Sequence, residues 1–379
     1  MMTTDLSLGL YVHIPFCLKK CAYCDFYSQT DYSKADAYIS ALLSEAAMLS
    51  GIYRDRTVET VYIGGGTPTS LSAGQLDFLL QGLNRCFSIN SHAEFTVEAN
   101  PATLDVEKLN VLQKNGVNRL SLGLQSASNT ELCKLSRIHS YEDFKTTYYL
   151  ARQYIDNISL DLMFGLPDQT QISFRDTLER AVDMSPNHIS LYALKIEEGT
   201  PFFQIEDKLV LPTEDEVADM YLYACDFLAK NEYRQYEISN FAQQGCSSKH
   251  NTRYWKRKDY IGLGPAAHSF VDGVRYANLS DLSLYIQALT NNTLPPRSEE
   301  NVVTFEEVLE EEIMLNLRLR EGLDMAYLEA KTGYAMEKTA AKTIQAYVKN
   351  GFMTQQGNTI ALTPRGFLVS NRIISDLLP

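Results

Sequence analysis

The stretch YVHIPFCLKKCAYCDF, residues 11–26, joins an apolar segment of strand length to a short loop that carries Cys17, Cys21 and Cys24. Three thiolates on one loop can bind one face of a compact metal centre and leave one metal position open to another ligand. Structural zinc sites close with four ligands, usually from two separated pairs, and this sequence has no second pair. Soft sulfur ligation therefore favours an iron–sulfur cluster, with a closed zinc site and three buried thiols as the alternatives.

Outward from this loop, apolar runs of strand length alternate with longer segments of helical periodicity over the first two hundred residues. Successive strand–helix units predict a parallel sheet with right-handed crossovers, and six units suit an open, barrel-like sheet whose ligands bind at the carboxyl ends of the strands. The expected helices include 32–49, 72–87 and 104–116, the last ending at Gly116. The expected strands cover 8–14, 59–65, 93–99, 117–124, 157–165 and 188–195.

Glycine and polar residues mark the ends of these strands. GGGTPT at 64–69 follows the second strand, where glycines let the backbone approach a ligand closely and leave N–H groups for a charged group. Three later strands end near Glu98, Gln125 and Asp161, and Arg137 follows a little further on. A carboxylate there suits a ribose hydroxyl or an amino group, and an arginine suits a carboxylate. Tight turns and helix caps are the structural alternatives.

The composition is that of a globular protein and excludes several classes. Of 379 residues, 45% are hydrophobic and 21% are charged, and the formal net charge is −13. A chain this acidic lacks the basic surface that sequence-independent binding to nucleic acid needs. It also has no apolar run of about 18 residues to span a membrane. Residues 1–16 carry no Lys or Arg and the seven cysteines are odd in number, so we expect no secretory signal, no disulfide framework and a cytosolic protein.

The regular alternation of strand-like and helix-like segments ends after residue 200. We divide the chain into a core over 1–200, an extension over 201–300 and a C-terminal domain over 301–379, with TNNTLPPRSEEN (290–301) as a linker. Helical segments and a hairpin-like pattern in the last domain are typical of a winged helix. DNA binding by this domain is disfavoured, because it carries eight basic and ten acidic side chains.

Together these motifs resemble those of the radical S-adenosylmethionine proteins of the oxygen-independent coproporphyrinogen III oxidase group. The resemblance rests on YVHIPFCxxxCxxC, GGGTPT, VEANP, LGLQS and DLMFGLP, and it covers nearly the whole chain. It implies a partial (β/α)6 barrel and a 4Fe–4S cluster ligated by Cys17, Cys21 and Cys24, with the methionyl amine and carboxylate of S-adenosylmethionine on the fourth iron. The S-adenosylmethionine site that it implies consists of Tyr11, Tyr23, Phe26, Gly65, Gly66, Thr67, Glu98, Gln125, Arg137, Asp161 and Ala193.

Two features separate the oxidase branch of this group from its heme chaperone branch. Oxidases are similar up to the third cysteine but carry a fourth cysteine two residues later, where this chain has Phe26. They also have a longer segment before the cluster, whereas sixteen residues precede Cys17 here. Conversely, HNTRYW (250–255) resembles the HNxxYW motif of the heme chaperone branch.

Residues 249–258 also suit heme on chemical grounds. His250 offers a nitrogen ligand for iron. Tyr254 and Trp255 offer flat apolar faces for a porphyrin. The alternative is a solvated loop with a buried histidine. Five cations in the same segment suit the heme propionates, namely Lys249, Arg253, Lys256, Arg257 and Lys258.

We therefore predict a heme chaperone that binds a 4Fe–4S cluster, S-adenosylmethionine and heme, and that lacks coproporphyrinogen III oxidase activity. The resemblance implies heme transfer to acceptor hemoproteins such as respiratory enzymes, and a cytoplasmic protein with peripheral association at the inner face of the membrane. No nucleic-acid partner is expected. The alternative function is an oxygen-independent coproporphyrinogen III dehydrogenase, and a DNA-binding regulator is a third, disfavoured class.

Overall fold

The computed structural model describes residues 6–379, and its first half has the expected alternation of strands and helices. The first six strands pair in chain order, and each pairing of consecutive strands is parallel. The strands are β1 Ser7–Ile14, β2 Thr57–Gly65, β3 Ile89–Ala99, β4 Arg119–Gln125, β5 Asn157–Phe164 and β6 His188–Ala193. The helices are α1 Ala35–Ile52, α2 Ala73–Cys86, α3 Val106–Lys114, α4 Asn129–Lys134, α5 Tyr141–Ala151 and α6 Gln171–Asp183, with short 3-10 turns η1 Pro68–Ser70 and η2 Pro101–Thr103.

Local sequence signals fix where several of these helices begin and end. Ser72, Ser140 and Thr170 each accept a hydrogen bond from the backbone N–H three residues later, and the side chain of that later residue bonds back, which closes a capping box. Asp105 caps α3 in a similar way, and the chain leaves this helix through Gly116 at φ +88°. The predicted stop at Gly116 is therefore confirmed, because a left-handed turn favours glycine.

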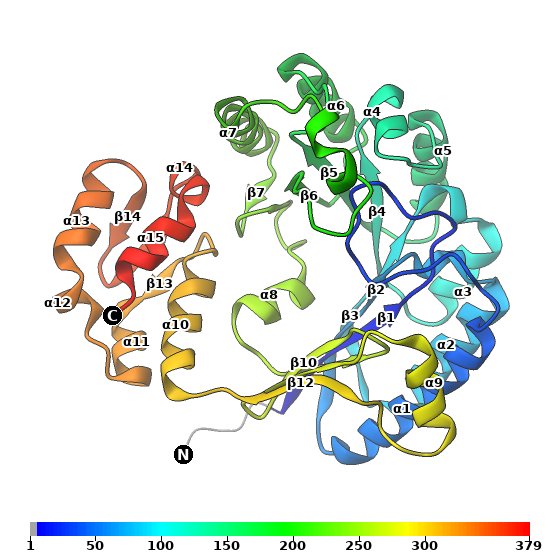
Figure 1. Ribbon diagram of the computed structural model, residues 1–379. Coiled ribbons are helices and arrows are strands. Elements are labelled where there is room, and N and C mark those ends of the chain that lie inside the picture. Colours follow the sequence, from blue (N-terminus) through cyan, green and yellow to red (C-terminus); the bar gives the residue numbers. More distant parts are fainter. Residues whose placement is uncertain (1–5) are drawn as a thin grey trace.

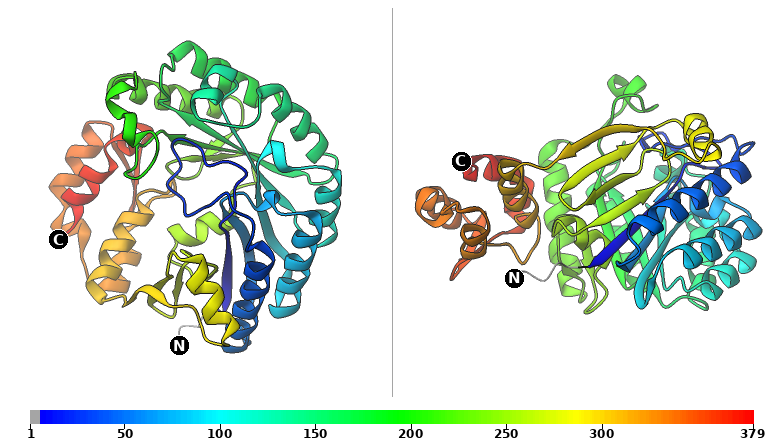
Figure 2. Two further views of the ribbon diagram at one scale, coloured as in Figure 1. Left: turned by 45° about the vertical axis from the view of Figure 1, so that its right-hand side comes forward. Right: turned by 90° about the horizontal axis from the view of Figure 1, so that it is seen from below.

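All but three of the strands belong to one sheet. Within the described residues this sheet has 12 strands in the order β12-β11-β10-β9-β1-β2-β3-β4-β5-β6-β8-β7. The parallel strands curve into an open barrel with their helices on the outside (Figures 1 and 2). On β4, Leu120, Leu122 and Leu124 are fully buried in the apolar layer under the helices, and the alternate residues face the barrel interior. The predicted open, barrel-like α/β fold is confirmed.

The middle of the chain extends both edges of this sheet. The expected linker over 290–301 is wrong in its second half, because residues from Arg297 onward pair with β11 as an exposed, charged edge strand. On one edge, β9 Tyr260–Leu263 lies parallel to β1, followed by the antiparallel β10 His268–Val271, β11 Val274–Asn278 and β12 Arg297–Val302. On the other edge lie β8 Asn240–Ala242 and β7 Arg234–Gln235, and the helices of this region are η3 Phe203–Lys208, α7 Glu214–Lys230, α8 Lys249–Trp255 and α9 Leu282–Thr290.

Helix α8 lies inside the barrel, against β2 and β3, instead of covering the outside (Figure 1). Its N-terminus is capped by Glu94 of β3, whose carboxylate accepts hydrogen bonds of 2.9 Å from the backbone N–H groups of Lys249 and His250. A negative charge at a helix N-terminus is stabilising. The ring of His250 stacks on that of Tyr62 from β2, with centroids 5.3 Å apart. These contacts hold α8 across the barrel interior.

The C-terminal domain is a set of helices around a small antiparallel sheet, which confirms the predicted winged-helix-like arrangement. It contacts the barrel where Arg257 lies between Glu311 and Glu312. Among the residues described, none of the helices has both the length and the apolar character to cross a membrane. The helices of the domain are α10 Phe305–Asn316, α11 Met325–Thr332, α12 Met336–Thr339, α13 Ala341–Lys349, α14 Pro364–Leu368 and α15 Ser370–Leu377, and its strands pair in the order β13 Leu323–Asp324, β15 Thr359–Leu362 and β14 Met353–Gln356.

Candidate functional site

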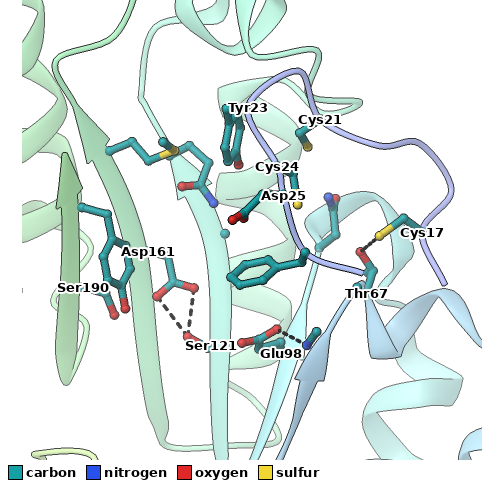
Figure 3. A pocket seen from close by; sticks show the side chains of 18 of the residues that line it. Cys17, Cys21, Tyr23, Cys24, Asp25, Thr67, Glu98, Ser121, Asp161 and Ser190 are labelled. Atoms are coloured by element: carbon teal, nitrogen blue, oxygen red, sulfur yellow. Dashed lines mark hydrogen bonds between the residues drawn. The ribbon is translucent and has the colours of Figure 1, made fainter. Parts of the chain in front are cut away.

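The carboxyl ends of the parallel strands surround a cavity of about 530 Å³, and the loop that follows β1 covers it (Figure 3). Tyr11 does not line this cavity. It lies deeper in β1, where its ring stacks on Tyr62 and its hydroxyl is 3.0 Å from Nδ1 of His13. The other predicted cluster and S-adenosylmethionine residues all line the cavity: Cys17, Cys21, Cys24, Tyr23, Phe26, Gly65, Gly66, Thr67, Glu98, Gln125, Arg137, Asp161 and Ala193.

The cysteine loop is held at the mouth of the barrel by hydrogen bonds to its backbone and its sulfur atoms. The Thr67 hydroxyl donates to Sγ of Cys17 at 3.5 Å, and the Arg137 guanidinium donates to Sγ of Cys21 at 3.5 Å. Burial raises the pKa of Cys17 and raises that of Cys24 to about 11, so these thiols ionise at neutral pH only beside a positive centre. Among residues 6–379, no three His, Cys, Asp or Glu side chains are arranged to hold a single metal ion.

The glycine loop after β2 packs against the cysteine loop. The backbone N–H of Gly66 donates to the carbonyl of Ile14 at 2.8 Å, and a Cβ on Gly66 would lie 2.7 Å from that oxygen. The N–H of Gly65 donates to the Glu98 carboxylate at 3.2 Å. The expectation that these N–H groups are left for a charged ligand is therefore wrong for Gly65 and Gly66. Glycine is needed here because two backbone segments approach closely.

Two half-buried carboxyl groups, those of Glu98 and Asp161, line the cavity below the cysteine loop (Figure 3). Glu98 accepts a hydrogen bond of 2.7 Å from the Tyr62 hydroxyl, and burial together with the nearby charge of Asp161 raises the pKa of Glu98 to about 7. The Ser121 hydroxyl lies 2.9 and 3.0 Å from the two oxygens of Asp161, whose pKa burial also raises. These groups can accept hydrogen bonds from hydroxyl or amino groups of a bound molecule.

His250, which the sequence predicts as an axial heme ligand, lies inside the barrel in this structure, and its role toward heme stays a prediction. The side chain has 0% exposure, and both ring nitrogens are occupied, Nδ1 by the Thr60 hydroxyl at 2.8 Å and Nε2 by the Tyr254 hydroxyl at 2.7 Å. Burial lowers the pKa of His250 to about 3, so the ring is neutral. The Tyr254 ring packs against the rings of His250 and Tyr260, with centroids 5.0 and 4.5 Å away, and both Tyr254 and Trp255 are half-buried.

The five cations of residues 249–258 do not act as one group. Arg253 is buried and donates to the backbone carbonyls of Ser7 and Asp259 at 3.0 and 2.9 Å, and Arg257 is bound by the C-terminal domain. The remaining three surround a second cavity of about 580 Å³ at the amino ends of β1 and β2, at the opposite end of the barrel from the thiols. This basic cavity is lined by Ser7, Glu59, Thr60, Ser247, Lys249, Thr252, Arg253, Lys256 and Lys258.

Several residues on the floor of the cysteine-side cavity were missed from the sequence. Arg119 and Ser121 lie an even number of residues before Gln125 on β4. Because alternate residues of a strand face the same side, the position of the strand predicts that both side chains point inward. Ser190 of β6 pairs in register with Asp161, which again predicts the same face. Asn251, from α8, has no such signal, because nothing local in the sequence places this helix inside the barrel.

Comparisons with known proteins agree with this arrangement. Residues 11–181 match the Radical SAM superfamily, and residues 303–369 match the HemN C-terminal domain family. The structure is similar to that of the coproporphyrinogen III oxidase HemN from Escherichia coli, a radical SAM enzyme, with a TM-score of 0.85 and 25% identity over 98% of this chain and 90% of that one.

Curated relatives cover the chain from end to end. It is 37% identical to the heme chaperone HemW of Bacillus subtilis over 97% of this chain and 98% of the relative. It is 36% identical to the heme chaperone HemW of Lactococcus lactis over 97% of this chain and 96% of the relative.

Proposed function

The chain belongs to the heme chaperone HemW family of radical SAM proteins, and from this premise we propose that it binds heme and passes it to acceptor hemoproteins. The observation that carries the proposal is the similarity to two named heme chaperones over 97% of the chain. The loop after the third cysteine adds to it, because Asp25 and Phe26 line the cavity where the oxidase branch is expected to have a further cysteine.

The radical SAM family implies a 4Fe–4S cluster and S-adenosylmethionine as cofactors. We assign the cluster to Cys17, Cys21 and Cys24, whose sulfur atoms lie on the loop above the cavity (Figure 3). Hydrogen bonds from Thr67 and Arg137 would stabilise two of these sulfurs as thiolates. When bound, the cluster and cofactor supply one-electron chemistry, and the protein supplies binding, orientation and a site screened from water.

The walls of the cavity offer contacts for the other parts of S-adenosylmethionine. The aromatic rings of Tyr23 and Phe26 flank the thiols and can pack on the adenine. Glu98 and Asp161 can accept hydrogen bonds from ribose hydroxyl or amino groups. Tyr11 would act from below, through Tyr62, which orients Glu98 by its hydrogen bond.

For heme we propose the outer side of residues 249–258, at the basic cavity. The ammonium groups of Lys249 and Lys256 can pair with the heme propionates. Trp255 adds an apolar face beside them. His250 and Tyr254 then support this segment from inside the barrel, since their polar atoms bond to each other and to Thr60, which itself lines the basic cavity.

The partners follow from this function. We propose that the acceptors are hemoproteins such as respiratory enzymes, and that the protein works in the cytoplasm with peripheral association at the inner face of the membrane. Heme held in the basic cavity, away from the cluster, would be accessible to an acceptor without opening the barrel.

A heme titration tests the proposal. Anaerobically reconstituted protein should develop a Soret band with micromolar or tighter affinity, about −8 kcal/mol or better. The double variant Lys249→Met/Lys256→Met should bind heme several-fold more weakly, while Lys114→Met/Lys230→Met on the outer helices α3 and α7 should bind as the wild type does. His250→Ala should weaken binding without moving the Soret maximum. A wild-type protein that binds no heme, or that keeps its heme when mixed with an apo-hemoprotein, contradicts the chaperone function.

A second candidate is an oxygen-independent coproporphyrinogen III dehydrogenase. The similarity to HemN over 98% of the chain favours it. The same anaerobic protein, given S-adenosylmethionine, a reductant and coproporphyrinogen III, separates the two functions, because only the dehydrogenase releases protoporphyrinogen.

A further inference from the structure

One hydroxyl group of the glycine loop is bonded to a thiol of the cysteine loop. The Thr67 hydroxyl lies 3.5 Å from Sγ of Cys17 (Figure 3). A thiolate has no proton to donate, so the hydroxyl is the donor whenever Cys17 binds iron. Cys17 is also the most buried of the three thiols, with 9% exposure, whereas Cys21 and Cys24 are half-buried. A hydrogen bond in such surroundings is stronger than one exposed to water.

The backbone around Thr67 fixes the direction of this hydroxyl. The N–H of Thr67 donates to the carbonyl of Phe16 at 2.7 Å, and the Ser70 hydroxyl donates to the same carbonyl at 3.3 Å. Pro68 follows and restricts Thr67 to the extended backbone seen here, with φ −132° and ψ 94°. The two heavy atoms on the threonine Cβ limit its side-chain rotation further. Thr67 is therefore held with its hydroxyl toward Cys17.

The second threonine of the loop, Thr69, shows the ordinary structural use of a hydroxyl. Its side chain is fully buried, and its hydroxyl lies 2.6 Å from that of Thr103 and accepts from the N–H of Asn100 at 3.3 Å. These bonds join two loops of the chain. Thr67 differs from Thr69 because the partner of its hydroxyl is an assigned iron ligand.

Hydrogen bonds to the sulfur atoms are among the factors that set the reduction potential of an iron–sulfur cluster. When such a cluster accepts one electron, no bond forms or breaks, and the negative charge on its sulfur ligands increases. A donor to one of these sulfurs then binds more strongly, because its acceptor is more negative.

We propose that Thr67 is a positioning residue that raises the reduction potential of the cluster through its hydrogen bond to Cys17. The resemblance implies a contact of Thr67 with S-adenosylmethionine, whereas this role acts through the thiolate. It rests on the proposed cluster ligands, goes beyond the chaperone function and does not depend on heme.

A redox titration with dithionite, followed by electron paramagnetic resonance, tests this role. The reconstituted protein is measured without S-adenosylmethionine, so that contacts with this cofactor make no contribution. Thr67→Val keeps the shape of the side chain and removes the hydroxyl, Thr67→Ser keeps the hydroxyl, and Thr69→Val is the matched control in the same loop. We expect T67V to lower the ratio of reduced to oxidised cluster at a fixed potential about three- to tenfold. For a one-electron couple this is a fall of about 30 to 60 mV, and T67S and T69V should keep the wild-type potential.

Thermal unfolding separates the role of Thr67 from a purely structural one. T69V should lower the melting temperature at an unchanged potential, because it removes the acceptor of the Asn100 N–H. A T67V protein that holds about four irons per chain at the wild-type potential overturns the proposal, and so does a T67S or T69V protein whose potential falls as far as that of T67V.

Two further outcomes separate this role from the other proposals. If T67V does not retain its iron, T67S decides alone, since a fall of about 30 mV or more in a variant that keeps the hydroxyl also overturns the role. A wild type that binds no iron overturns the role together with the cluster ligands. Heme binding, which we expect to be unchanged in T67V, tests the chaperone function separately.

Discussion

Replacing Arg257 by methionine should loosen the C-terminal domain from the barrel. Nε of Arg257 is 2.6 Å from Glu311 and its Nη1 is 3.3 Å from Glu312, and the three side chains are 8%, 12% and 4% exposed. Removing one partner of a buried ion pair costs about 3–5 kcal/mol when the other charge is left alone. Here each glutamate keeps one cation, Arg275 and Lys331 respectively, both at 2.7 Å, so we expect a smaller loss of about 2 kcal/mol.

Amide hydrogen exchange of the helix that carries the two glutamates, α10, measures this loss. A change of about 2 kcal/mol should speed exchange there about 30-fold, while α1 and α2 on the far side of the barrel keep their protection. The adjacent Lys256 provides a matched control, because its pair with Glu321 is 39% and 58% exposed and should contribute about 0–1 kcal/mol. If R257M and K256M change the protection of α10 equally, the ion pairs of Arg257 do not hold the domain in place.

Three further predictions address the cluster, the chemistry and the pH dependence. Cys21→Ala should abolish the roughly four irons per chain found after anaerobic purification, while Cys86→Ala on α2 should keep them, and a full iron content in C21A contradicts the ligand assignment. Coproporphyrinogen III should not be converted, because Phe26 replaces the extra cysteine of the oxidases, and steady turnover with S-adenosylmethionine would reverse that conclusion. The free energy of unfolding in urea should fall as the pH rises from about 5 to 7, because burial raises the pKa of Glu45 to about 7. Over this range the folded state holds a proton that the unfolded chain has lost. Glu45→Gln should flatten the dependence of stability on pH, and an unchanged dependence excludes Glu45 as its source.

The sequence predicts the barrel well because each of its signals is local. The expected strand 188–195 is β6 His188–Ala193, and helix α7 Glu214–Lys230 also has a local signal at its start. The capping box of Thr213 and Glu216 fixes the start of that helix from four residues alone. The expectation that ligands bind at the carboxyl ends of the strands is also local. Parallel strands end at the same edge of the sheet, so the cysteines and the polar residues at the ends of four other strands line one cavity.

The arrangement of residues 249–258 depends on distant contacts that the local sequence does not predict. The composition of this segment predicts a cationic, aromatic surface loop. Three-dimensional contacts divide it instead, because Glu94 caps its helix from more than 150 positions away and Glu311 binds Arg257 from a helix of another domain. The sequence around His250 is equally compatible with a histidine that binds iron and with a buried histidine that supports the helix. Only its two hydrogen-bond partners, Thr60 and Tyr254, distinguish the roles.

The polar interior of the barrel is held together by interactions between its own side chains. Inward positions of the parallel strands carry many polar groups, and most of them have partners from other strands or from the segment that fills the barrel. His188 is bonded to Ser159 at 2.7 Å and to the Tyr236 hydroxyl at 2.8 Å, and His250 has two partners as well. Buried polar groups that satisfy one another fix a structure, whereas one left unsatisfied costs stability. Arg119 follows the same pattern electrostatically, because its positive charge lies near the Asp161 carboxylate and counteracts the effect of burial on the pKa of that group.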